Sequence, residues 1–349
     1  MERRSTRVIK VGNRLIGGDN PITVQSMTNT VTSDVEKTVA QIIRLEDAGC
    51  DIVRLAISNL DDAKAIAEIK KNISIPMIAD IQYDYKLALE SIKYGIDGLR
   101  INPGNIGSLD KVKEIVKACK ENEISIRIGV NSGSIKKEFL EKYAGVNEDS
   151  MVESALEQIR LLEGLDFHHI KISLKASNVP LTIKSYKKMS QVRDYPLHLG
   201  VTEAGPGYRG TVKSSVGIGS LLAMGIGDTI RISLTEDPVE EVKIGREILK
   251  SLELLNEGIE LISCPTCGRT KINLIEMVQE AEKRLEGIDK HIKVAIMGCP
   301  VNGPGEAREA DIGIAGGNGR GIIFLKGKIH KTVDEEELLD ELIEEIKKL

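Results

Sequence analysis

The chain has 349 residues, of which 41% are hydrophobic and 29% charged, a balance typical of globular proteins. Its formal net charge of -5 argues against a nucleic-acid binder that works by bulk electrostatics. The N-terminus is followed by no apolar stretch long enough for a signal peptide or a membrane span, so we expect a cytoplasmic protein without a membrane or nucleic-acid partner.

Residues 1–256 alternate short β-branched runs with amphipathic stretches, as expected for repeated β–α units. Eight such units predict an α/β fold, a TIM (β/α)8 barrel, in this N-terminal domain. A doubly wound open sheet is the competing fold. We expect Asp34 or Ser33 to cap the first helix and Ser150 the fifth. The predicted strands are Ile22–Met27, Asp51–Ile57, Pro76–Ile81, Gly98–Asn102, Ile124–Val130, His169–Lys175, Leu197–Thr202 and Thr229–Leu234.

One face of five of these strands is basic where barrel strands usually carry Val or Ile. Side chains alternate across a strand, and the opposite face is apolar, so we expect the basic face to line the barrel lumen. One such cation is readily explained by a structural ion pair, but inward acids are few, Asp80 being the clearest. A bound anion is therefore expected, and guanidinium groups suit phosphate. The basic side chains on this face are Arg54, Arg100, Arg127, Lys171, Lys175 and Arg231.

Ligands of TIM barrels bind at the C-terminal ends of the strands. Asn102, Asn131, Lys175 and Ser233 lie at such ends, so we expect the anion there.

Gly205–Gly210 matches the G-x-G-x-x-G pattern of dinucleotide-binding proteins and follows a predicted strand. Pro206, the late position in the chain and the lack of a distal acidic residue argue against a dinucleotide fold. We expect instead a flexible loop over the barrel mouth.

The segment Leu254–Gly258 is a predicted boundary, and residues 257–349 form a small C-terminal α/β domain. Its expected elements are a strand up to Ser263, a helix over Ile272–Leu285, strands Ile292–Ile296, Asp311–Ala315 and Gly321–Leu325, and a last helix over Asp334–Lys348.

Three of the 5 cysteines lie in this second domain, as Cys264-Pro-Thr-Cys267 and Gly298-Cys299-Pro300. Clustered cysteines in a cytoplasmic protein are more often metal ligands or redox groups than disulfides. Glu306, His291 or His330 would complete a four-ligand site. The spacing leaves three possibilities: an iron–sulfur cluster, a structural zinc, or a dithiol formed by Cys264 and Cys267.

Seven segments resemble the 4-hydroxy-3-methylbut-2-enyl diphosphate synthases of the non-mevalonate isoprenoid pathway, in their bacterial two-domain form. The two cysteine segments are the most specific. The segments are Val24-Gln-Ser-Met-Thr-Asn, Gly98-Leu-Arg-Ile-Asn-Pro-Gly-Asn, Arg127-Ile-Gly-Val-Asn-Ser-Gly-Ser, Leu199-Gly-Val-Thr-Glu-Ala-Gly, Gly225-Ile-Gly-Asp-Thr-Ile-Arg-Ile-Ser-Leu-Thr, Ser263-Cys-Pro-Thr-Cys-Gly-Arg and Met297-Gly-Cys-Pro-Val-Asn-Gly-Pro-Gly-Glu.

The resemblance implies reductive dehydroxylation and ring opening of 2-C-methyl-D-erythritol 2,4-cyclodiphosphate. It implies a [4Fe–4S] cluster held by Cys264, Cys267, Cys299 and Glu306, with Glu306 the exchangeable ligand and Glu203 an acid at the reacting end of the substrate. It implies a diphosphate site formed by Arg54, Arg100, Arg127, Asn131, Lys175, Arg231 and Ser233.

Two features qualify this resemblance. The family usually has Asp-Ile-His-Phe where this chain has Asp80-Ile-Gln82-Tyr83, so a role for an aromatic nitrogen there is not carried over. No flavin or nicotinamide motif is present, so we expect the two electrons to come from an external ferredoxin or flavodoxin.

Barrel topology adds a prediction about assembly. The eighth helix should end near Lys250, so the chain should leave the barrel at the end opposite the active site. We therefore expect a head-to-tail homodimer in which the barrel of one chain receives the cluster domain of the other. The remaining alternatives are a zinc-stapled phosphate-ligand binding protein and a dithiol oxidoreductase.

Overall fold

The computed structural model describes residues 2–288, 290–299 and 309–349. The chain divides into two compact units, Met1–Leu255 and Asn256–Leu349. Among the described helices, none combines the length and the apolar character that crossing a membrane requires.

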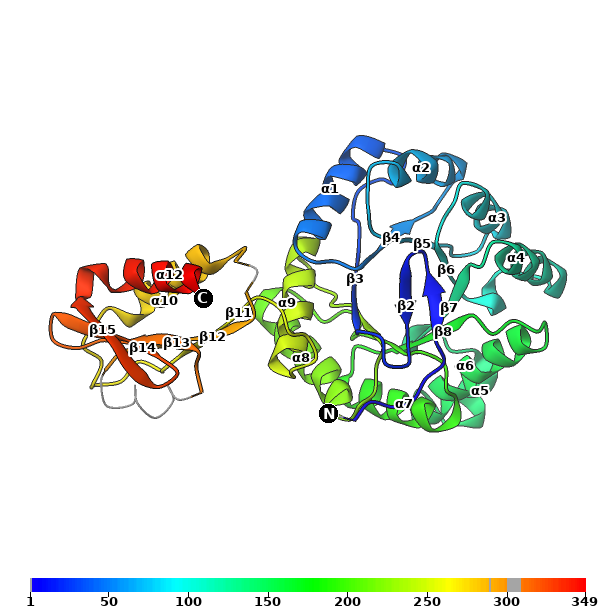
Figure 1. Ribbon diagram of the computed structural model, residues 1–349. Coiled ribbons are helices and arrows are strands. Elements are labelled where there is room, and N and C mark those ends of the chain that lie inside the picture. The colour runs from blue at the N-terminus through cyan, green and yellow to red at the C-terminus, as the bar shows by residue number, and fades with distance from the viewer. Residues whose placement is uncertain (1, 289, 300–308) are drawn as a thin grey trace. The chain divides into compact units, whose positions relative to one another are not determined.

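The first unit is a barrel of eight parallel strands surrounded by helices (Figure 1), which confirms the predicted fold and excludes the open sheet. Neighbouring strands follow the order β8-β7-β6-β5-β4-β3-β10-β9. A single parallel bridge between Ile172 and Leu197 joins the two ends of this order and closes the ring. The strands are β3 (Thr23–Met27), β4 (Ile52–Ala56), β5 (Met77–Asp80), β6 (Gly98–Ile101), β7 (Ser125–Asn131), β8 (Ile170–Lys175), β9 (His198–Leu199) and β10 (Thr229–Ile230).

Helices follow the strands and return the chain to the start of the next strand. Asp34 caps α1 by accepting from the backbone of Lys37, as predicted. The cap predicted at Ser150 is wrong, because Asn147 caps α6 and Ser150 is its partner three residues later in a capping box. The helices are α1 (Val35–Asp47), α2 (Leu60–Lys70), α3 (Tyr85–Lys93), α4 (Leu109–Glu121), α5 (Lys137–Lys142), α6 (Glu148–Glu163), α7 (Val179–Val192), α8 (Gly207–Ala223) and α9 (Pro238–Ser251).

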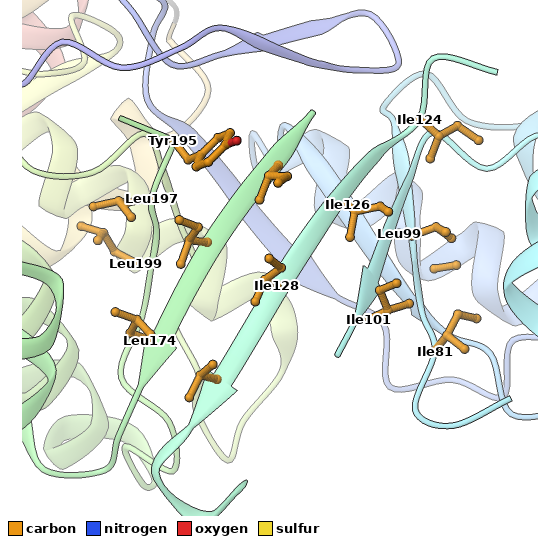
Figure 2. Packing of buried hydrophobic residues seen from close by; sticks show 14 of the residues in the cluster. Ile81, Leu99, Ile101, Ile124, Ile126, Ile128, Leu174, Tyr195, Leu197 and Leu199 are labelled. Atoms are coloured by element: carbon orange, nitrogen blue, oxygen red, sulfur yellow. The ribbon is translucent and has the colours of Figure 1, made fainter. Parts of the chain in front are cut away.

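The core of this unit is the layer between strands and helices, and it is almost entirely aliphatic. Figure 2 shows members of this layer on successive strands, including Ile126 and Ile128 of β7 and Leu174 of β8. These residues alternate with Arg127, Ser173 and other inward residues, so the apolar outer face of each strand forces the polar face into the lumen.

An antiparallel hairpin, β1 (Ile9–Val11) and β2 (Arg14–Ile16), precedes the barrel and was not predicted. Its buried residues Ile9, Val11 and Ile16 cluster with Ile52 and Ile78, which lie at or near the starts of β4 and β5. The hairpin therefore closes the end of the barrel at which the strands begin, and it crosses the centre of the ring in Figure 1.

The predicted loop at Gly205–Gly210 is only partly a loop. Helix α8 begins at Gly207, so the second half of the motif is the first turn of a helix. Gly210 has no room for a side chain, because an added Cβ would approach the carbonyl oxygen of Gly205 to 2.4 Å. The spacing of these glycines therefore reflects tight packing of the loop against α8.

The second unit is a five-stranded sheet in the order β11-β12-β13-β14-β15. Strands β11, β12 and β13 are parallel, and β14 and β15 are antiparallel to their neighbours. Strand β15 was not predicted, and the last helix begins at Leu338 rather than Asp334. The elements are β11 (Ile259–Ser263), α10 (Leu274–Leu285), β12 (Ile292–Met297), β13 (Ile312–Ala315), β14 (Arg320–Leu325), β15 (Lys328–Asp334) and α12 (Leu338–Lys348).

Candidate active site

A polar pocket opens at the C-terminal end of the barrel strands. Its lining contains all seven residues predicted to bind the anion, together with five others from the same loops and strands. The predicted seven are Arg54, Arg100, Arg127, Asn131, Lys175, Arg231 and Ser233, and the others are Asp80, Gln82, Ser173, Val201 and Thr202.

The register of the parallel strands gathers these side chains. Arg100 of β6 lies beside Arg127 of β7, and Asp80 of β5 lies beside Arg100. At the end of the next pair, Asn131 of β7 is level with Lys175 of β8. Paired residues of neighbouring strands point to the same side of the sheet, so strand register directs these side chains into one cavity.

Asp80 partly balances the positive charge. Its carboxylate lies 3.1 Å from Nη1 of Arg100 and 3.5 Å from Nε of Arg54. Burial raises the pKa of Asp80, but the surrounding guanidinium groups of Arg54, Arg100 and Arg127 outweigh this effect and lower it overall. Asp80 is therefore ionised and holds two arginines at the pocket wall.

Glu241 on α9 plays the same part for Arg231 and was not found by sequence reasoning. Its side chain is 4% exposed and lies 3.5 Å from Nη2 of Arg231. It also accepts from the backbone N–H of Leu234 at 2.9 Å and from the hydroxyl of Ser26 at 3.3 Å. No strand pattern marks this residue, because it reaches the barrel wall from a helix.

Arg127 has no comparable partner. It is 2% exposed, and its Nε and Nη1 atoms lack a hydrogen-bond partner among the described residues. Burial, followed by the nearby Arg54 and Arg100, lowers its pKa well below the ordinary value for arginine. The described lining thus holds five basic side chains and one carboxylate, an imbalance that an anion would correct.

A second set of polar groups lies in the lumen around Lys175. Lys175 Nζ is 3.3 Å from Nε2 of His198, whose Nδ1 is 2.9 Å from the hydroxyl of Thr229. Lys171, two inward positions earlier on β8, is 1% exposed, and its Nζ has no hydrogen-bond partner in the described part of the chain. Sequence patterning placed Lys171 inward but gave no sign of this arrangement.

Two residues near the mouth lie outside the pocket. Glu203 is exposed with a left-handed backbone (φ 52°), although its neighbours Val201 and Thr202 line the pocket. Asn102 turns away to accept from the backbone N–H of Gly104. Gln82, where the resembled family has histidine, does line the pocket.

The cysteines of the second unit lie past the C-terminal ends of two neighbouring parallel strands. Ser263, the last residue of β11, is level with Ile296 of β12, so Cys264 and Cys299 leave the same edge of the sheet. The backbone N–H of Gly298 donates to Cys264 Sγ at 3.2 Å. The loop after Cys267 returns to this edge, where Lys271 donates to the carbonyl of Gly298 at 2.9 Å.

The cysteines differ in environment. Cys299 is buried, whereas Cys267 is exposed, and hydrogen bonds from the backbone and side chain of Arg269 lower its pKa. Within residues 2–288, 290–299 and 309–349, no three His, Cys, Asp or Glu side chains are grouped closely enough to hold a metal ion. Glu306, the predicted fourth ligand, lies outside the described residues.

The histidine alternatives do not fit this edge. His291 precedes β12 and is separated from Gly298 by the six residues of the strand, about 20 Å of extended chain. His330 lies on β15, where its Nε2 is 3.3 Å from the carboxylate of Glu345 on α12. Cys264 and Cys299 leave this edge, and Cys264 accepts a backbone N–H bond, so the chemistry of these side chains suits an iron–sulfur cluster although the described residues do not form a closed metal site.

Comparison with known proteins gives consistent matches to one family. A family model for the GcpE TIM-barrel domain matches residues 6–246, and one for the GcpE protein C-terminal domain matches residues 260–348. A 4-hydroxy-3-methylbut-2-en-1-yl diphosphate synthase (flavodoxin) from Caldanaerobacter subterraneus subsp. tengcongensis is 62% identical, covering 99% of this chain and 98% of the relative. A protein of the same name from Clostridium tetani is 60% identical over 100% of both chains.

Solved structures match the barrel. The dihydropteroate synthase of Yersinia pestis has a TM-score of 0.52 at 12% identity, covering 71% of this chain and 100% of that one. A type I 3-dehydroquinate dehydratase from Clostridium difficile has a TM-score of 0.52 at 14% identity, covering 71% and 98%. At such identity these similarities show the barrel fold alone.

Proposed function

The chain belongs to the GcpE family, and we propose on this basis that it converts 2-C-methyl-D-erythritol 2,4-cyclodiphosphate to 4-hydroxy-3-methylbut-2-enyl diphosphate by reductive ring opening, with electrons from a flavodoxin. The observation that carries the proposal is the single pocket lined by five basic side chains and, among its described residues, one carboxylate. The zinc-stapled binding protein and the dithiol oxidoreductase find no support in these relatives.

The pocket supplies the binding energy for the cyclic diphosphate. We propose that the two negative charges of the substrate are bound by Arg54, Arg100, Arg127, Lys175 and Arg231. Asn131 and Ser233 would donate hydrogen bonds at the rim of the pocket. A guanidinium group can bind two phosphate oxygens at once, and three of these groups are held in place by ion pairs with Asp80 and Glu241. Arg127 lines the pocket and, within the described structure, lacks an ion pair of the kind that holds the other three arginines, so it is the strongest candidate for direct contact with phosphate.

The second unit is the proposed cluster domain, with Cys264, Cys267, Cys299 and Glu306 as ligands of a [4Fe–4S] cluster. When bound, such a cluster supplies the electrons to the substrate one at a time. The backbone N–H of Gly298 donates to Cys264 and stabilises the thiolate form that a ligand requires.

Glu203 is the proposed acid for the departing hydroxyl group. It follows Thr202, a pocket residue, on a loop with a left-handed backbone that places its side chain apart from the lumen cations. A carboxyl group in this position can donate a proton at the mouth of the pocket without pairing with the arginines that bind the diphosphate.

We also propose that the active site is shared between two chains in a head-to-tail homodimer working in the cytoplasm. The course of α9 supports this proposal: Glu241, in its first turn, contacts Arg231, whereas Arg246 donates to the carbonyl of Gly49, just before β4 begins. Helix α9 therefore carries the chain from the pocket to the opposite end of the barrel before the second unit starts. Mixing Cys299→Ser chains with Arg127→Ala chains should restore activity, and mixed dimers without activity would contradict the shared site.

The direct experiment is turnover of the cyclodiphosphate by protein purified without oxygen, with reduced flavodoxin and with an artificial reductant. The proposal predicts a brown, iron- and sulfide-containing protein that forms 4-hydroxy-3-methylbut-2-enyl diphosphate. A colourless, zinc-containing protein without turnover would contradict it.

A further inference from the structure

The lumen of the barrel holds more basic groups than diphosphate binding alone explains. Lys171, Lys175 and His198, which we call the base layer, lie on neighbouring strands β8 and β9, and none is more than 9% exposed. Lys175 lines the pocket, whereas the other two do not, so the layer reaches from the pocket into the closed part of the barrel.

The contact between Lys175 and His198 limits the charge that this pair can carry. Their nitrogens are 3.3 Å apart, and a hydrogen bond at this distance needs one nitrogen to accept. An ammonium group and an imidazolium ring have only donors, so the pair holds at most one positive charge.

Thr229 allows the same contacts to persist with or without that charge. When Lys175 is protonated, it donates a hydrogen bond to Nε2 of His198, and the Nδ1–H group of His198 donates one to the Thr229 hydroxyl. When Lys175 is neutral, Nε2 donates to its lone pair and the Thr229 hydroxyl donates to Nδ1. The two states differ by one proton, and no electron moves between them.

The surrounding charges disfavour the protonated state of the Lys175–His198 pair while the pocket holds no anion. The cations facing the base layer lie on β4, β6 and β7 and directly after β10. The nearby carboxylates are already paired with arginines, Asp80 and Glu241 with arginines of the pocket. Asp228 lies 3.4 Å from Arg3 and accepts from Thr6 and the backbone of Leu197. Tyr186 also lies against this layer and donates to the carbonyl of His198. The facing cations are Arg54, Arg100, Arg127 and Arg231.

Titration tendencies agree with this geometry. Burial, followed by Arg127, lowers the pKa of Lys171 to about 7. Burial, followed by Arg127, lowers the pKa of Lys175 well below its ordinary value, and burial, followed by Lys175, does the same for the pKa of His198. Two negative charges placed in the pocket act in the opposite direction and favour the protonated forms.

We propose that binding of a dianion in the pocket draws a proton from solvent into the base layer, so that the protein takes up a proton whenever it binds its diphosphate substrate. In the free protein the neutral bases reduce the repulsion among the cations of the lumen. In the complex the added proton strengthens the electrostatic attraction to the dianion. The inference depends on the proposed function only for the identity of the dianion.

Calorimetry of the full-length, cluster-loaded protein without reductant tests this proposal. The cyclodiphosphate is titrated at pH 8 in HEPES and in Tris, whose heats of ionisation differ, and sulfate serves as a second dianion. Neither ligand changes its own charge near this pH. We expect uptake of about one proton per dianion, and an affinity that falls about tenfold per pH unit above pH 8. Equal binding heats in both buffers, or no binding of either anion, would contradict the proposal.

Three variants locate the proton. Lys171→Met removes one group that can gain the proton, and His198→Gln gives Lys175 a permanent amide acceptor, so that Lys175 is already protonated before the anion binds. Each variant should reduce the uptake by about half or more, and the double variant should abolish it. Lys187→Met, which removes the same charge from the exposed face of α7, should leave it unchanged. Full uptake in both single variants and the double variant would place the proton elsewhere.

The same experiment separates this inference from the proposed function. If sulfate binds with proton uptake but the cyclodiphosphate does not bind, the proposed substrate is wrong and the proton uptake stands. If the cyclodiphosphate is converted but binds without uptake, the function stands and the inference is wrong.

Discussion

The barrel lumen and the cysteine edge of the second unit represent two ways of preparing a site. In the lumen, strand register brings five cations together in advance, and Asp80 and Glu241 hold three of them in place. At the cysteine edge, Cys264 and Cys299 leave neighbouring strands, but no metal-binding group is assembled within the described residues. The side chains of the lumen are therefore positioned by the folded chain itself, whereas those of the cysteine edge are expected to be positioned only when the proposed cluster binds.

The largest effect is expected at the cysteine edge. Cys299→Ser should abolish turnover and reduce the iron content, because the loss of one ligand from an unassembled site leaves little to retain a cluster. Cys119→Ala is the matched control, since this thiol is buried on α4 and burial raises its pKa to about 12, which makes it inert. Iron, sulfide and turnover are measured for both; a Cys299→Ser protein with full iron content and activity would contradict the assignment.

The next effect tests the preassembly of the lumen. Asp80→Asn removes the carboxylate shared by Arg54 and Arg100, both largely buried, and should reduce the free energy of unfolding by about 3–5 kcal/mol. Sulfate should recover more stability in this variant than in the wild type, because the anion supplies the missing charge. Chemical denaturation with and without sulfate measures both, and an unchanged stability would show that Asp80 does not organise the site.

Substitution of Lys171 is expected to raise the free energy of unfolding, by a smaller amount than Asp80→Asn lowers it. The pKa of this side chain is about 7 in the folded protein and about 10.4 in an unfolded chain, so the unfolded state binds more protons between these values. The free energy of unfolding should therefore rise from pH 7 to pH 10. Below pH 7 both states are protonated, and the cost of the buried charge is fully present.

Lys171→Met should lack this rise and should be about 1–3 kcal/mol more stable than the wild type at pH 7, since it removes an unpartnered buried charge. Denaturation at a series of pH values provides the measurement, with Lys187→Met as the surface control. A less stable Lys171→Met protein would indicate that Lys171 is charged and paired.

The contrast also explains what sequence reasoning could predict. The eight barrel strands and the inward position of Arg54, Arg127 and Lys175 follow from a two-residue alternation against an apolar outer face, which is readable in any strand of sufficient length. The hairpin β1–β2 has strands of three residues, and β15 is a polar edge strand, so neither shows such a pattern.

Other features depend on partners distant in sequence. Glu241 reaches Arg231 from a helix, and the contact between His198 and Thr229 joins residues 31 positions apart. Ser150 and Asn147 are both common capping residues, and only the local backbone decides between them. The contacts of Glu241 and His198 arise from packing between distant residues, and the choice of cap arises from backbone geometry; local sequence patterns specify neither.

The most direct test of the account is the affinity of Arg127→Met for the cyclodiphosphate without reductant. This variant removes a guanidinium with two unpartnered nitrogens from the described lumen, so it should fold at least as stably as the wild type. The account predicts a dissociation constant raised about a hundredfold, with iron content unchanged. Wild-type affinity in the folded variant would contradict the claim that the lumen cations bind the substrate.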